Sequence, residues 1–223
     1  MSEIAMELTS RDGFRFGALR VEAAGARKGG LVLVQEIFGI NTSMAEAARK
    51  FAKAGFEVIV PSMFDRQEKG FIREGHDSEA LTAGSTHARA NGLDNALSDI
   101  GACIDALEGP VFISGYCYGG SMAYMAACRL DGLVAASCYY GSLIPGAKAM
   151  EPRCPTITHF GRHDAHIPVD GVEAFAKARP DVPTYIYDAG HGFARANSGD
   201  YDAAADALAW TRTMDLFAQA FIR

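Results

Sequence analysis

The stretch VFISGYCYGG at residues 111–120 decides the fold, because it reads as a buried strand that turns sharply into a helix. Its apolar start is followed by Gly115, Cys117 and Gly119 in a G-x-C-x-G pattern. This pattern is typical of a nucleophile elbow, a strained strand-to-helix turn that presents one side chain at the carboxyl edge of a sheet. A helix start there favours a thiolate and offers backbone N–H groups to an oxyanion. We therefore expect Cys117 to be a nucleophile. The alternative is a small buried apolar residue, as we expect for Cys103, Cys128 and Cys138.

Short apolar runs with turn signals between them lie on both sides of this junction. We predict buried strands at Leu31–Val34, Val58–Val60, Val111–Ser114, Val134–Tyr140, Thr156–Phe160 and Thr184–Tyr187. Longer segments with helical spacing separate these strands, and such alternation is typical of a mainly parallel sheet with helices on both faces. The sequence therefore predicts the α/β class and, together with the elbow, an α/β-hydrolase fold in a single domain over residues 1–223.

Two local signals mark elements in the N-terminal half. Ser43 and Glu46 have the spacing of a capping box, and Gly55 suits a left-handed stop, so we expect a helix between them. The runs Ala5–Leu8 and Arg15–Leu19 flank a turn, which predicts a hairpin that forms an antiparallel edge of the sheet.

Two further segments carry recognisable patterns. The last helix is expected to bury one apolar face made of Trp210, Met214, Phe217 and Phe221. Residues 65–93 turn polar and carry several glycines, which indicates an excursion over the sheet edge. This excursion is either a mobile lid on a substrate pocket or a plain solvated connection.

The composition excludes several classes of protein. The formal net charge is −6, with 49% hydrophobic and 22% charged residues, which fits a globular chain and argues against a nucleic-acid partner. No apolar run is long enough to cross a bilayer, and the first seven residues lack the basic start of a signal peptide. The five cysteines are odd in number and contain no C-x-x-C pair, which argues against a disulfide framework. We therefore expect a cytoplasmic protein with no membrane partner.

An elbow needs a base, and α/β-hydrolases place the acid and then the histidine after later strands. Asp164 follows the predicted strand Thr156–Phe160, and His191 lies between two glycines after Thr184–Tyr187. The order predicts a triad of Cys117, Asp164 and His191. Taken singly, Asp164 could be a turn cap and His191 a surface loop residue, and Asp188 is a rival orienting acid.

A second cluster has ligand types suitable for zinc. It contains His159, His163 and His166 with Asp164. His159 falls inside a predicted strand and no partner cysteine lies near, so we predict no metal site.

Five motifs resemble the dienelactone hydrolase (carboxymethylenebutenolidase) family. They are Gln35-Glu36-Ile37-Phe38-Gly39-Ile40-Asn41, Gly115-Tyr116-Cys117, Tyr139-Tyr140-Gly141, Gly161-Arg162-His163-Asp164 and His191-Gly192-Phe193-Ala194-Arg195. The resemblance spans nearly the whole chain, and the cysteine elbow with the Gln-Glu-Ile-Phe-Gly segment is its specific part. It implies a carboxylic ester hydrolase that cleaves a small ester or lactone through a thiol acyl-enzyme, without a cofactor.

The resemblance also implies a role for each site residue. Cys117 is the nucleophile, His191 the base and Asp164 the acid that orients it. Glu36 holds the resting cysteine until substrate displaces it, which fits the cost of an unpaired buried carboxylate. The remaining roles are an oxyanion site of the N–H groups of Ile37 and Tyr118, and a substrate-binding set of Arg195, Tyr140 and Phe38.

Two departures from the family pattern bear on the substrate. Leu81 and Ser85 stand where the family has its second substrate-binding arginine and a nearby tyrosine, so half of the carboxylate clamp is missing unless residues 65–93 fold inward and Arg73 or Arg89 substitutes. Tyr118 follows the nucleophile where an aliphatic residue is expected. Two alternatives stay open: a carboxylesterase or thioesterase of different preference, and a non-catalytic thiol-based binding or redox-sensing module. We expect a monomer or weak dimer.

Overall fold

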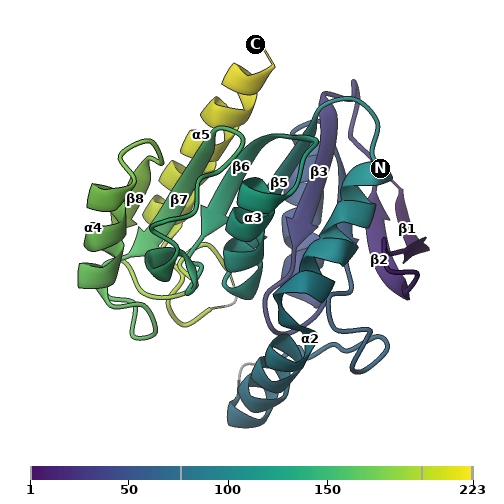
Figure 1. The fold of residues 1–223 in the computed structure, drawn as a ribbon, viewed down its shortest axis with the longest axis horizontal. Coiled ribbons are helices and arrows are strands. Elements are labelled where there is room, and N and C mark those ends of the chain that lie inside the picture. The colour runs from purple at the N-terminus through teal and green to yellow at the C-terminus, as the bar shows by residue number, and fades with distance from the viewer. Residues whose placement is uncertain (1, 76, 197, 222–223) are drawn as a thin grey trace. The chain divides into compact units, whose positions relative to one another are not determined.

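A computed structural model describes residues 2–75, 77–196 and 198–221. Eight strands form one sheet in the order β1-β2-β4-β3-β5-β6-β7-β8 (Figure 1), which confirms the predicted α/β class with a mainly parallel sheet. The internal contacts of the chain divide it into two compact units, Met1–Ile113 and Ser114–Arg223.

The first unit begins with the predicted hairpin. Strands β1 (Glu3–Thr9) and β2 (Arg15–Val21) pair antiparallel, and β1 is an edge strand. Strands β3 (Gly29–Val34) and β4 (Phe56–Pro61) pair in parallel and are buried throughout. Their near-continuous apolar sequences follow from burial on both faces of a parallel sheet, where no side chain meets water.

Helix α1 (Thr42–Lys53) connects β3 to β4. Its N-cap is Asn41, whose Oδ1 accepts a hydrogen bond from the backbone N–H of Met44 at 3.1 Å. The predicted capping box of Ser43 and Glu46 is therefore wrong, because asparagine is as strong a cap as serine and stands two residues earlier. Gly55 has φ +102°, so the predicted left-handed stop is confirmed.

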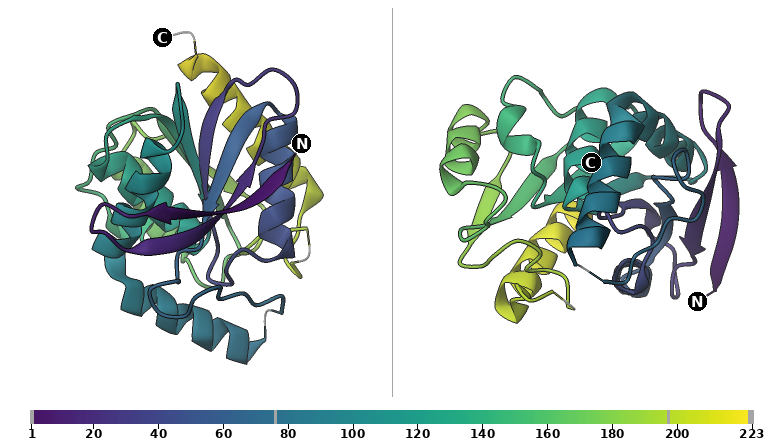
Figure 2. Two further views of the ribbon diagram at one scale, coloured as in Figure 1. Left: turned by 90° about the vertical axis from the view of Figure 1, so that its right-hand side faces the viewer. Right: turned by 90° about the horizontal axis from the view of Figure 1, so that it is seen from below.

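Helix α2 (Ser78–Asp105) occupies much of the region expected to be an irregular excursion. Asp77 caps its start, and its helical geometry is broken at Gly92, where φ is 69° and ψ 176°. We call residues 78–91 the α2 arm. Figure 1 and the left view of Figure 2 show the arm at the bottom of the picture, where it projects away from the strands of the first unit. That residues 65–93 act as a lid stays a prediction.

The second unit contains the rest of the sheet. Its elements are β5 (Val111–Tyr116, which starts in the first unit), α3 (Tyr118–Arg129), β6 (Leu133–Tyr139), the short 3-10 helix η1 (Ile144–Gly146), β7 (Thr156–Gly161), α4 (Val169–Ala178), β8 (Thr184–Tyr187) and α5 (Ala203–Ala220). Strand β7 pairs in parallel with both β6 and β8. All six predicted strands lie on observed strands, but Tyr140 falls just after β6, and Tyr187 is the one buried residue of β8.

Helix α5 buries a different face from the one expected. Its buried residues recur every fourth position and are Ala205, Ala209, Thr213 and Phe217. Phe221 caps the helix and is 39% exposed, and Trp210 and Met214 are only half-buried, so the prediction was wrong for three of its four residues. Two of the four buried residues are small alanines, which let the helix backbone approach its neighbours closely and leave Trp210 and Phe221 at the margin of the contact.

A polar network lies in the core of the second unit around His159, a fully buried residue of β7. Its Nδ1 lies 2.8 Å from the hydroxyl of Tyr187, and its Nε2 lies 3.2 Å from Oγ of Ser137 and 3.3 Å from Oγ1 of Thr213. Burial lowers the pKa of His159 to about 3. The neutral ring can donate from one nitrogen and accept at the other, so the network joins β6, β7, β8 and α5.

No helix among the described residues is long and apolar enough to cross a membrane.

Candidate active site

Cys117 lies at a sharp turn between β5 and α3 and has φ 54°, a left-handed conformation that is rare outside glycine. A Cβ on Gly115 would lie 2.2 Å from the carbonyl oxygen of Gly119, and one on Gly120 would lie 2.1 Å from that of Tyr139. Neither contact is possible, so the turn requires glycine at both positions. Cys117 is half-buried, whereas the thiols of Cys103, Cys128 and Cys138 are buried. The predicted elbow geometry is therefore present.

Asp164 and His191 come together from the loops after β7 and β8. The two loops pack closely, because a Cβ on Gly161 would lie 2.4 Å from the carbonyl oxygen of Ala189. His191 Nδ1 lies 2.7 Å from Oδ2 of Asp164. The other carboxylate oxygen accepts the backbone N–H groups of His166 at 2.7 Å and Ile167 at 3.0 Å. Both oxygens of this buried carboxylate are thus engaged, which fixes its orientation toward the imidazole.

The charges of the three groups are mutually supportive. Burial disfavours the charged form of His191. Its hydrogen bonds to Asp164 and Cys117, and the electrostatic interaction with both residues, outweigh burial and raise the pKa of His191 to about 10. Burial likewise opposes the charged form of Asp164, but the hydrogen bond and charge of His191 and the two backbone donors lower its pKa. Because Nδ1 faces the carboxylate, Nε2 of His191 is the nitrogen left to serve Cys117.

Asp188, the alternative orienting acid, and the histidines of the alternative metal cluster have other partners. Asp188 accepts from Nε2 of the exposed His163 at 2.6 Å, and His159 is held in the core network. The ring of His166 lies edge-on to that of His191, with centroids 5.1 Å apart. Within residues 2–75, 77–196 and 198–221, no three His, Cys, Asp or Glu side chains are grouped to hold a metal ion.

Further predicted residues surround His191 in the second unit. The buried ring of Tyr140 lies 5.0 Å from the His191 ring, and its backbone has φ 35°. The guanidinium of Arg195 folds back over Gly192, where an added Cβ would lie 3.2 Å from its Nη2. Tyr118 is the first residue of α3, so its N–H is among those that have no acceptor within the helix.

Glu36, Ile37 and Phe38 belong to the first unit, directly after β3. Glu36 is 2% exposed. The side chain of Gln35 donates to the carbonyl of Glu36 at 3.1 Å and accepts from the backbone N–H of Met63 at 3.2 Å. The loop is therefore firmly held within its own unit, and the roles of its residues toward Cys117 stay predictions.

Sequence reasoning missed two residues at this site. Gly120 is as necessary to the elbow as Gly115, and the Gly-Gly pair at 119–120 was the available signal. His166 was considered only as a metal ligand, and no pattern in the sequence indicated its contact with the His191 ring.

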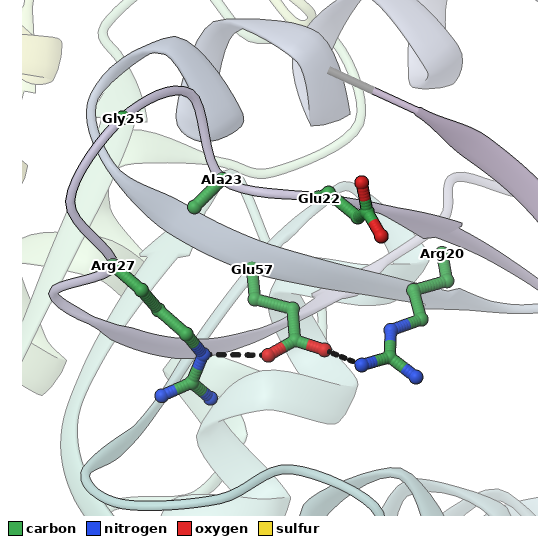
Figure 3. A pocket seen from close by; sticks show the side chains of 6 residues that line it. All are labelled: Arg20, Glu22, Ala23, Gly25, Arg27 and Glu57. Atoms are coloured by element: carbon green, nitrogen blue, oxygen red, sulfur yellow. Dashed lines mark hydrogen bonds and ion pairs between the residues drawn. The ribbon is translucent and has the colours of Figure 1, made fainter.

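A separate pocket in the first unit is lined by Arg20, Glu22, Ala23, Gly25, Arg27 and Glu57. Figure 3 shows Glu57 between two arginines, and its Oε2 lies 2.6 Å from Nε of Arg27. The pocket lining contains no nucleophile or imidazole, and both arginines pair with Glu57, so the pocket is not the catalytic site.

Comparison with known proteins places the chain in a family. The sequence profile of the dienelactone hydrolase family matches residues 16–221. The chain belongs to this family. It is 30% identical to carboxymethylenebutenolidase of Pseudomonas putida, over 96% of this chain and 95% of that protein. It is 27% identical to carboxymethylenebutenolidase 1 of Cupriavidus pinatubonensis, with the same coverage.

Solved structures of dienelactone hydrolase type share the fold. A crystal structure of a dienelactone hydrolase-like promiscuous phosphotriesterase from metagenomic libraries superposes with a TM-score of 0.80 at 22% identity, over 99% of each chain. The α/β-hydrolase fold expected from the elbow is thereby confirmed. As a member of the dienelactone hydrolase family, the protein is an enzyme, a carboxylic ester hydrolase.

Proposed function

We propose that this dienelactone hydrolase family member cleaves a small ester or lactone through a Cys117, His191 and Asp164 triad and a thiol acyl-enzyme. The observation that carries the proposal is the 2.7 Å hydrogen bond between His191 and Asp164, together with the electrostatic coupling of His191 to Cys117, which lies at a strained strand-to-helix turn. This arrangement has the three parts that nucleophilic acyl transfer needs: a nucleophile, a base in contact with it, and an acid that orients the base.

Acylation begins when the sulfur of Cys117, its proton held on Nε2 of His191, attacks the carbonyl carbon of the substrate. The C–S bond forms and the carbonyl oxygen becomes an oxyanion. The N–H of Tyr118 stabilises this charge, and the family resemblance assigns the second donor to Ile37. When the oxyanion collapses, the ester C–O bond breaks, and His191 gives its proton to the departing alkoxide.

Deacylation reverses the roles with water as the nucleophile. His191, now neutral, takes a proton from water as the water oxygen attacks the thioester carbonyl. The C–S bond breaks and the acid product leaves. The proton that His191 took from water stays on Nε2 beside the Cys117 sulfur, which restores the starting state. By family resemblance, Glu36 holds the resting cysteine between turnovers.

A substrate carboxylate is the group that Arg195 would recognise. The guanidinium fork binds carboxylates in bidentate geometry, and Arg195 folds back toward the residue that follows His191. The relatives named carboxymethylenebutenolidase support a carboxylate-bearing lactone as one substrate class. Leu81 and Ser85 replace the second half of the clamp, so we propose that the enzyme depends on a single arginine for this contact.

Arg195→Ala is expected to raise KM for a carboxylate-bearing lactone or ester by about 10- to 100-fold, the effect of losing one charge-assisted contact. KM for an uncharged ester of similar size should change less than about threefold. The measurement is a steady-state comparison of matched substrate pairs. Arg162→Ala removes an exposed arginine that pairs with Glu173 at 3.3 Å, and it serves as the control. Equal losses for both substrate classes in Arg195→Ala would mean that Arg195 supports the fold.

The acyl-enzyme itself can be trapped. Rapid mixing with excess 4-nitrophenyl acetate should release about one equivalent of nitrophenol in a burst when deacylation is the slower step, followed by continued turnover. Acid quench should leave an added acetyl mass on the peptide that contains Cys117. Release that stops at one equivalent would indicate a thiol-sensing module, and an acetyl group located on another residue would refute the proposed nucleophile.

A further inference from the structure

Gly84 occupies an unusual place inside the α2 arm, because the helix backbone there touches the loop that follows β3. A Cβ added to Gly84 would lie 2.1 Å from the carbonyl oxygen of Ile37 and 3.0 Å from its Cβ. No side chain can be accommodated at such a distance. Glycine is less favourable than alanine in a helix interior, so this contact is a physical reason for glycine at this position.

Several other contacts hold the arm and the loop together. His87, on the next turn of the arm, has its Nε2 3.2 Å from a carboxylate oxygen of Glu68, and its ring lies 4.6 Å from the ring of Phe71. The segment after Phe71 reaches the same loop, where the N–H of Arg73 donates to the carbonyl of Phe38 at 2.8 Å. The carbonyl groups of Ile37 and Phe38, in the two peptide units that follow Ile37, are therefore both contacted from outside the loop.

The arm has a point at which it can move as one piece. Gly92 has φ 69° and interrupts the helix directly after the arm, and an added Cβ there would meet nothing within 4 Å. The arm is therefore not held in line by the rest of α2, and its position depends on the contacts that Gly84 and His87 make.

We propose that the α2 arm is a positioning element for the oxyanion site, in which Gly84 sets the backbone of Ile37 by direct contact and His87 keeps the arm in place. The inference rests on the proposed function, because it matters only if the N–H of Ile37 stabilises an oxyanion. A Cβ on Gly84 would press on the carbonyl group and on the Cβ of Ile37 together, so it would displace the residue as a whole, including the Cα that joins the carbonyl to the N–H. Gly84 and His87 then act on the reaction without contacting the substrate.

Gly84→Ala tests this inference, with Gly75→Ala as the matched control. Gly75 lies in the same unit and is exposed, and its added Cβ would meet only a carboxylate oxygen at an ordinary 3.6 Å. We expect Gly84→Ala to lower kcat for an uncharged chromogenic ester by about 10- to 100-fold, less than the 10²- to 10³-fold loss for deleting an oxyanion donor. KM should change less than threefold, and Gly75→Ala should behave as wild type.

Alkylation of Cys117 by iodoacetamide distinguishes a defect in the oxyanion site from a defect in the triad. This displacement occurs at a saturated carbon and forms no oxyanion, so its rate on the Cys117 peptide should differ less than twofold between Gly84→Ala and wild type. His87→Ala introduces no clash but loosens the arm, and it should lower kcat in the same direction with the same unchanged alkylation rate.

The outcomes are distinguishable. Wild-type kcat in both Gly84→Ala and His87→Ala would overturn the inference, as would an alkylation rate that falls in parallel with kcat. If Gly84→Ala fails to fold, His87→Ala decides the question alone. Failure of the proposed function gives a different result, since wild-type enzyme would then show no acetyl group on Cys117 at all.

Discussion

Replacing Cys117 by alanine is expected to lower kcat/KM for a chromogenic ester by about 10⁴-fold or more. The residual rate is what the enzyme achieves by binding the ester and polarising its carbonyl group without a nucleophile. The methyl group of alanine cannot form the C–S bond, and no hydroxyl remains to substitute for it. The backbone conformation of residue 117, with φ 54°, is no less accessible to alanine than to cysteine. Steady-state kinetics with an activated acetate ester measures the loss.

Cys154→Ala is the matched control, because Cys154 is the other described cysteine that is half-buried rather than buried. It should retain wild-type turnover. Thermal unfolding of both variants should stay within a few degrees of wild type, which separates a chemical loss from a folding loss. Turnover by Cys117→Ala within tenfold of wild type would place the nucleophile elsewhere and end the assignment.

The sequence predicts well the parts of this fold in which the local sequence preference agrees with the environment that the tertiary structure imposes. Strands β3 to β7 are mostly apolar because a parallel sheet that is buried on both faces leaves few places for polar residues, and those it holds, such as His159, have hydrogen-bond partners in the core. The elbow is recognisable because a positive φ at Cys117 and a helix backbone close to Gly115 can be met by few sequences. Gly55 signals the end of α1 for the same conformational reason.

The parts that sequence reasoning missed depend on distant partners. Ser43 has a capping pattern, but Asn41 takes the cap, and its Nδ2 also donates to the carbonyl of Arg73 32 residues away. The buried face of α5 carries Ala205, Ala209 and Thr213 besides Phe217, so hydrophobicity pointed to larger residues, three of which are only partly buried. Periodicity could not choose between Asp164 and Asp188, because the choice depends on which loop lies beside His191.

The choice between Asp164 and Asp188 as the orienting acid has a direct chemical consequence. Asp164→Asn is expected to lower kcat/KM by about 10²- to 10⁴-fold, and Asp188→Asn to have no effect beyond about twofold. One oxygen of Asp164 accepts two backbone N–H groups, so an asparagine would keep its oxygen there and turn its NH₂ toward His191. Nδ1 of His191 would then have to accept, which places the proton on Nε2 and prevents it from receiving the proton of Cys117.

The pH profile of Asp164→Asn provides a second test of the same geometry. The active state has one proton shared by His191 and Cys117, and the pKa of His191 is raised to about 10 by partners that include Asp164. A raised pKa keeps this proton as the pH rises, so wild-type kcat/KM should fall only as the pH passes through about 10. Removing the carboxylate charge lowers the pKa of His191. The alkaline limb of the kcat/KM profile of Asp164→Asn should therefore move to lower pH. Asp188→Asn should keep the wild-type limb, since Asp188 is bonded to His163. A shift in Asp188→Asn with none in Asp164→Asn would exchange the two acids and require a different loop to orient the base.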